Sequence, residues 1–88
     1  MSDKTFHLEI LTPERTIYAG EVVSLTAPGG LGSLGVLANH APLVTTLTPG
    51  KIAFREASGG SKTMLSAGEG FLEVYKNRAT LLADAVTA

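Results

Sequence analysis

Hydrophobic residues alternate with polar ones along much of the chain, and this period of two is the feature that most restricts its fold. Phe6, Leu8 and Ile10 share one side of the first such run, and a second run at 22–27 repeats the pattern. Successive side chains of a β-strand point to opposite faces of a sheet, so each run predicts a strand with one buried face. Further strands are expected at 44–47, 52–55, 63–65, 71–75 and 80–83.

Turn-forming residues separate these runs. Pro13 has no N–H to donate to a strand ladder, so it is expected to end the first strand. Pro49 and Gly50 fit the central positions of a type II turn, and 58–61 reads as a flexible Ser-Gly-Gly-Ser loop. Asn77 tolerates a positive φ, which predicts a tight hairpin at that point. Turn signals about eight to twelve residues apart are typical of an all-β sandwich or barrel.

The size of the chain favours a single domain. It has 88 residues and no cysteine, so neither disulfides nor thiolate chemistry are available to it. A domain of this size buries only about 60 to 65% of the surface that its unfolded chain exposes. The prediction is therefore one all-β domain over 1–88, a two-layer antiparallel β-sandwich around one thin core.

A helical reading of the C-terminal part is the main alternative for the fold. Residues 72–85 can be drawn as a helix with apolar residues on one side. The aromatic and β-branched character of 71–75, followed by the break at 76–78, favours a strand instead. Residues 84–88 show no strand pattern, so no strand is expected there.

Charge and hydropathy exclude several classes of partner. Seven Lys and Arg against eight Asp and Glu give a net charge of -1, with no basic field to bind a phosphate backbone. The longest apolar stretch, at 34–38, is far shorter than the roughly 20 residues that a membrane-spanning helix needs. Polar residues near the N-terminus interrupt any hydrophobic signal region. A mature cytoplasmic protein is expected.

A Gly-x-Gly-x-x-Gly pattern at 30–35 is the one motif that resembles a nucleotide site. In dinucleotide-binding proteins these glycines open a helix whose N-terminal amides face the pyrophosphate. Here Pro42 follows too soon for an adequate helix, and the chain is too short for a doubly wound sheet. The glycines are instead expected to shape a surface loop between strands.

No catalytic or metal-binding set is visible. His7 and His40 are the only imidazoles and lie 33 residues apart, whereas a zinc or iron site needs three or four converging ligands. His7 is expected to be solvent-exposed, and His40 to be presented by a loop. The serines lack a nucleophile-elbow motif, and Glu69, between two glycines, has no second acid. The sequence predicts a non-enzymatic protein with no catalytic residue, metal or cofactor.

Residues 34–43, which read Leu-Gly-Val-Leu-Ala-Asn-His-Ala-Pro-Leu, resemble the L-G-hydrophobic-x-P-G-H-A-P-L segment of the epsilon subunits of F-type ATP synthases. The resemblance continues in the same order at 8–15, 20–22, 47–50, 70–74 and 82–84, and so covers nearly the whole chain. The joint order of these segments makes the resemblance specific. The chain is identified as a member of this family.

The resemblance implies a β-sandwich of about ten short strands at the foot of the central stalk. It implies a non-catalytic rotor subunit that joins the gamma subunit to the c ring and couples proton flow to ATP synthesis. Such a subunit is a peripheral part of the complex, at the cytoplasmic face of the inner or thylakoid membrane. Matched by position, contacts to gamma are expected from Thr12, His40 and Thr45, and contacts to the c ring from Leu31, Gly32, Ser33 and Leu34. The stretch 24–48 has no Lys, Arg, Asp or Glu, as suits a contact region.

Two departures from the family bear on function. Relatives commonly carry acidic residues in the loop that faces the c ring, whereas this chain has Leu31 and Ser33. Many relatives also continue into a helical hairpin that blocks ATP hydrolysis. The chain ends at Ala88, so inhibition by helix insertion is not expected of it.

A small carrier or ligand-binding β-domain is the alternative function. A carrier needs an exposed lysine at a hairpin tip, and Lys76 lies near such a place. The neighbouring Asn77 and Arg78 do not resemble the flanking residues of such carriers.

Overall fold

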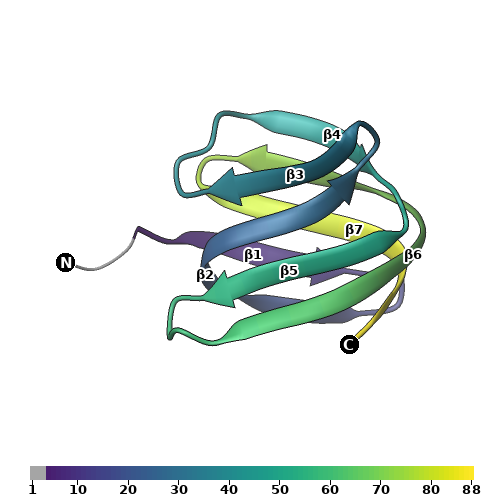
Figure 1. The fold of residues 1–88 in the computed structure, drawn as a ribbon, viewed down its shortest axis with the longest axis horizontal. Helices are drawn as coiled ribbons and strands as arrows, with labels where there is room; N and C mark the ends of the chain where they lie inside the picture. Colours follow the sequence, from purple (N-terminus) through teal and green to yellow (C-terminus); the bar gives the residue numbers. More distant parts are fainter. Residues whose placement is uncertain (1–3) are drawn as a thin grey trace.

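The computed structural model describes residues 4–88 as seven β-strands, with no helix in that range (Figure 1). The strands are β1 (Phe6–Leu11), β2 (Thr16–Gly29), β3 (Gly32–Leu37), β4 (Leu43–Leu47), β5 (Gly50–Glu56), β6 (Ser61–Tyr75) and β7 (Arg78–Thr87). The all-β prediction is confirmed. Residues 4–88 include no helical segment that could span a bilayer.

The expectation of about ten short strands is wrong, because two strands are long and each pairs with different neighbours along its two parts. β2 has 14 residues and β6 has 15. The first part of β2 pairs with β1 and its second part with β3 and β5. Likewise, β6 pairs first with β5 and then with β4. Register shifts at 22–24 and 67–70 mark irregularities in these long strands, and Figure 1 shows both strands curving between the layers.

The sheet is mixed, so the prediction of an antiparallel sandwich is wrong for one pair of strands. β1 lies parallel to β7 and antiparallel to β2, whereas the other paired strands are antiparallel. The parallel pair joins the first and last strands of the chain. Parallel neighbours need a long connection, and here the whole intervening chain provides it.

The C-terminal strand is longer than its sequence indicates. Residues 84–87 belong to β7, contrary to the expectation that they form no strand. Ala85, Val86 and Thr87 pair with the first part of β6. Only Val86 of these three packs against the core, which explains why the segment has no alternating pattern. Backbone pairing with a distant strand determines its structure.

The core is built from the predicted alternation. β1 follows it closely, because Phe6, Leu8 and Ile10 are buried and the residues between them are half-buried. Every strand contributes at least one side chain to the same buried cluster. The tight hairpin predicted at Asn77 is confirmed: Lys76 and Asn77 have φ values of 49° and 59°, and the flanking residues pair directly. Such a two-residue turn with two positive φ angles matches the twist of the strands.

The surface loop expected at 30–35 is much shorter than predicted. Gly30 and Leu31 alone form the turn between β2 and β3, and the remaining glycines of the motif belong to β3. No helix follows them, which removes the basis for a dinucleotide site of the usual kind.

Candidate partner-binding surfaces

The loop that carries His40 connects β3 to β4. Asn39, at φ 64°, donates its main-chain N–H to the side-chain oxygen of Asn77 at 2.8 Å. His40 donates its main-chain N–H to the carbonyl of Leu37 at 3.2 Å. Its ring Nδ1 lies 2.7 Å from the carbonyl oxygen of Ala41 and therefore carries the hydrogen of that bond. The His40 loop is thus an ordered feature beside the β6–β7 hairpin.

The four residues expected to face the c ring lie at the β2–β3 turn. Leu31 projects fully into solvent, and Gly32 has a φ of 121°. Together with Ser33 and Leu34 they border a shallow, mainly apolar depression of about 210 Å³, which Thr45 also lines. The turn presents an uncharged surface around a single exposed leucine.

The structure does not bring the three predicted gamma contacts together. The His40 loop and the β2–β3 turn lie at opposite ends of β3 (Figure 1). Six residues of strand separate these ends by about 20 Å. Thr45 lies beside the predicted c-ring residues, and Thr12 lies in the β1–β2 turn, where its N–H donates to the carbonyl of Arg15 at 2.9 Å. A single partner has to extend along the sandwich to reach all three.

An exposed apolar surface that the sequence prediction missed covers β4 and β6. Val44, Phe71 and Tyr75 are 68%, 43% and 54% exposed. Val44 pairs with Glu73 and Thr46 with Phe71, so all five side chains share the outer side of these strands. We call these five residues the outer β4–β6 face. The signal was present in the sequence, because Phe71 and Tyr75 alternate with the buried Leu72 and Val74.

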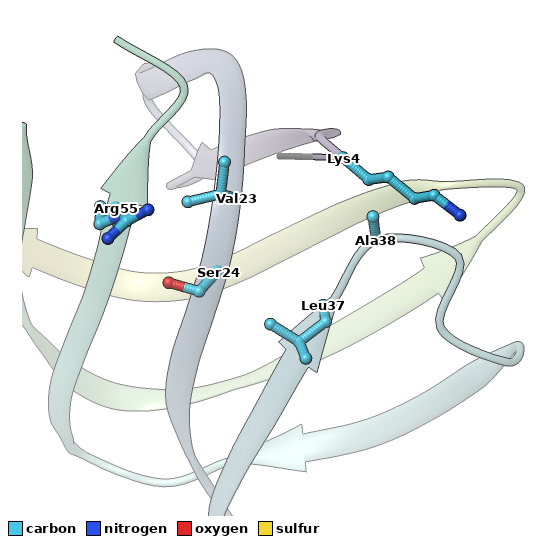
Figure 2. Close-up of a pocket in the computed structure, with 6 residues that line it drawn as sticks. All are labelled: Lys4, Val23, Ser24, Leu37, Ala38 and Arg55. Carbon is cyan, nitrogen blue, oxygen red and sulfur yellow. The ribbon is translucent and has the colours of Figure 1, made fainter. Parts of the chain in front are cut away.

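Another depression lies over β2, β3 and β5 and has a volume of about 460 Å³ (Figure 2). Figure 2 shows Arg55 and Lys4 on opposite sides of it, with Ser24 and Leu37 between them. Val23 and Ala38 complete the lining. Among the described residues that line this depression, none is a carboxylate or a histidine.

Several ionisable groups are paired with one another. Arg78 donates to Glu9 at 2.7 Å, and the Nδ1 of His7 lies 3.0 Å from a carboxylate oxygen of Glu21. His7 was expected to be solvent-exposed, and its side chain is 31% exposed beside Glu21. Within 4–88, no three potential metal ligands are close enough to hold an ion. Lys76 occupies the hairpin tip that a carrier would use, with its Nζ 5.4 Å from the centre of the Tyr75 ring.

Tyr18 is held in a polar contact at the edge of the core. Its hydroxyl donates to Glu56 at 2.9 Å, and its ring centre lies 4.5 Å from that of Phe54. Burial, followed by the contacts with Glu56, raises the pKa of Tyr18 from 10.0 to about 12. This contact favours the neutral phenol, so its contribution to stability is complete below pH 10 and is lost as pH rises through 12.

We therefore expect the free energy of unfolding to fall between pH 10 and pH 12, and to fall less in a Tyr18→Phe variant, which has no phenol to ionise. Urea unfolding at a series of pH values in this range measures the difference. Tyr75→Phe is the matched control, because it makes the same change at an exposed tyrosine in another part of the sheet. Equal slopes for wild type and Tyr18→Phe would contradict the assignment.

Comparisons with known proteins point to one family. The family described as "ATP synthase, Delta/Epsilon chain, beta-sandwich domain" matches residues 5–88. The ATP synthase epsilon chain of Pelotomaculum thermopropionicum is 46% identical over 85 residues, which cover 97% of this chain and 62% of the relative. The ATP synthase epsilon chain of Syntrophomonas wolfei is 43% identical over 84 residues, which cover 96% of this chain and 61% of the relative. The chain thus spans about three fifths of the length of these relatives.

Solved structures share the fold. A chain of the Euglena gracilis mitochondrial ATP synthase, solved with OSCP, F1 and the c-ring, superimposes with a TM-score of 0.88 at 20% identity. The match covers 99% of this chain and 55% of that one. A chain of the Tetrahymena thermophila mitochondrial ATP synthase central stalk and c-ring superimposes with a TM-score of 0.79 at 18% identity. This match covers 98% of the present chain and 68% of the other. At these identities the likeness concerns the fold alone.

Proposed function

The chain belongs to the family of the ATP synthase delta/epsilon chain β-sandwich domain, and on that premise we propose that it is a non-catalytic subunit of the central stalk of an F-type ATP synthase. In this role it joins the gamma subunit to the c ring and couples proton flow to ATP synthesis. It is a peripheral part of the complex at the cytoplasmic face of the inner or thylakoid membrane. The family match over 5–88 carries this proposal.

The surfaces described above suit two partners bound at once. The outer β4–β6 face and the His40 loop are the proposed contact with gamma, because they combine exposed apolar and aromatic side chains with one carboxylate. The β2–β3 turn, with Leu31, Gly32, Ser33 and Leu34, is the proposed contact with the c ring. The two surfaces lie at different places on one tightly packed sandwich, which suits a part that transmits torque.

Thr12 and Thr45 keep a place in this proposal as further contacts with gamma. Thr45 shares its strand with Val44 but lies on the other side, next to the c-ring turn. Gamma is therefore proposed to reach Thr45 at the depression that Leu34, Leu43 and Thr45 line. The described residues form no helix, so we expect the 88-residue chain by itself to leave ATP hydrolysis uninhibited.

Calorimetric titration of the purified chain with the gamma subunit of its own organism tests the proposal. We expect a one-to-one complex with a dissociation constant of about 1 µM or lower, as is usual for a specific interface. The chain alone is expected to hydrolyse no ATP. Absence of a complex at concentrations of about 100 µM would contradict the proposed function.

A further inference from the structure

Asn77 connects the β6–β7 hairpin to three other segments of the chain. Its side-chain oxygen accepts the N–H of Asn39, at 2.8 Å. Its side-chain nitrogen donates to the carbonyl of Thr5, at 2.9 Å. Its own main-chain carbonyl accepts the N–H of His7, at 3.2 Å. One exposed turn residue therefore makes hydrogen bonds with the His40 loop, with the segment before β1, and with β1.

The conformation of the His40 loop depends on the hydrogen bond between Asn39 and Asn77, because a loop lacks the ladder of backbone hydrogen bonds that holds a strand. Asn39 lies in the left-handed region, at φ 64°, which asparagine adopts more readily than most residues but which is sparsely populated. Among the hydrogen bonds described for 38–42, the others join His40 to Leu37 and to Ala41, both close in sequence. The bond from Asn39 to Asn77 is the one that spans 38 residues. Its loss would leave the conformation of the loop to local contacts.

We propose that Asn77 is a positioning residue that holds the His40 loop in the conformation that gamma binds. The inference rests on the proposed function, because it takes gamma as the partner of that loop. Asn77 acts through Asn39 and contributes to affinity by ordering the loop before binding. A loop that is already ordered loses less conformational entropy when it binds.

Two substitutions at Asn77 separate its hydrogen bonds. Asn77→Gly keeps the positive φ at no steric cost and removes both side-chain bonds. Asn77→Asp keeps an acceptor for the N–H of Asn39 but cannot donate to the carbonyl of Thr5, and aspartate also tolerates the left-handed region. Lys76→Gly is the matched control, because Lys76 lies in the same turn at φ 49° and makes no hydrogen bond with the His40 loop among the described contacts.

Hydrogen exchange of the Asn39 amide in the free chain, measured by NMR, is the first readout. We expect Asn77→Gly to speed exchange at Asn39 about tenfold or more, because the amide loses its acceptor. Asn77→Asp and Lys76→Gly are expected to stay within about threefold of wild type. Unchanged exchange at Asn39 in Asn77→Gly would overturn the positioning role.

Affinity for gamma is the second readout, with thermal unfolding recorded for every variant. We expect the dissociation constant to rise about tenfold in Asn77→Gly, and to stay within about threefold in Asn77→Asp and Lys76→Gly. Equal affinity of Asn77→Gly and wild type would overturn the link between the loop and binding. If the wild-type chain fails to bind gamma, the proposed function is wrong, and exchange at Asn39 still decides whether Asn77 positions the loop.

Discussion

Replacing Gly70 with valine is expected to destabilise the folded chain by about 3 kcal/mol or more. Gly70 follows the irregular part of β6 and pairs with Ala83 of β7. A Cβ atom at Gly70 would overlap the carbonyl group of Leu82 and the Cα of Ala83. These are backbone atoms, which cannot rotate away as a side chain can. β6 and β7 must therefore separate locally, and urea unfolding followed by circular dichroism measures the loss.

Gly35→Val is the control for this prediction. Gly35 also lies in a strand, its φ is outside the left-handed region, and a Cβ there would meet nothing within 4 Å. We expect its free energy of unfolding to stay within about 0.5 kcal/mol of wild type, as is usual for an exposed substitution. Equal stability of Gly70→Val and Gly35→Val would contradict the claim that the backbone of β7 lies too close to Gly70 for a side chain.

Replacing Phe71 with glutamate is expected to weaken gamma binding about 30-fold to 100-fold, an effect of the size found for central interface residues. The change removes an aromatic side chain from the outer β4–β6 face. It also places a carboxylate in a contact that excludes water, where an unpaired charge is strongly unfavourable. Val44→Glu, at a more exposed position of the same face, is expected to act in the same direction. Calorimetric titration with gamma measures both.

Leu65→Glu is the matched control for the binding prediction. Leu65 is 56% exposed and lies on β6 as well, but in the part of that strand that pairs with β5. The three variants thus introduce the same charge at exposed apolar positions of the sheet. We expect Leu65→Glu to bind gamma within about threefold of wild type. If Leu65→Glu loses binding and Phe71→Glu keeps it, the gamma contact lies where β6 pairs with β5, and not on the outer β4–β6 face.

Local patterns predicted the parts of the fold that depend on local physics. The alternation of Phe6, Leu8 and Ile10 identified β1 and its buried side, because burial of one face imposes a period of two. Asn77 identified the hairpin, because few residues accept the φ angles of a two-residue turn. The sequence did not indicate that β6 is one continuous strand. Separate strands were expected at 63–65 and 71–75, whereas β6 runs through both and the N–H of Glu69, between them, bonds to Asp84 of β7 at 2.9 Å.

Strand pairing between segments far apart in the sequence could not be predicted from local patterns. Nothing in the sequence indicates that β1 lies parallel to β7, or that 85–87 pair with β6. The binding surfaces are a mixed case. The side of Thr45 could have been read from its sequence position, because it alternates with Val44 and shares its side with the buried Leu47. The separation of Thr12, His40 and Thr45 required the three-dimensional arrangement.

Hydroxyl-radical footprinting of the chain, free and in complex with gamma, tests most directly whether the outer β4–β6 face binds gamma. Phe71, Tyr75 and Leu65 are all exposed in the free chain and are therefore open to oxidation. We expect oxidation of Phe71 and Tyr75 to fall several-fold in the complex, because binding excludes water from them, while that of Leu65 stays unchanged. Protection of Leu65, with Phe71 and Tyr75 oxidised as fast as before, would contradict the account.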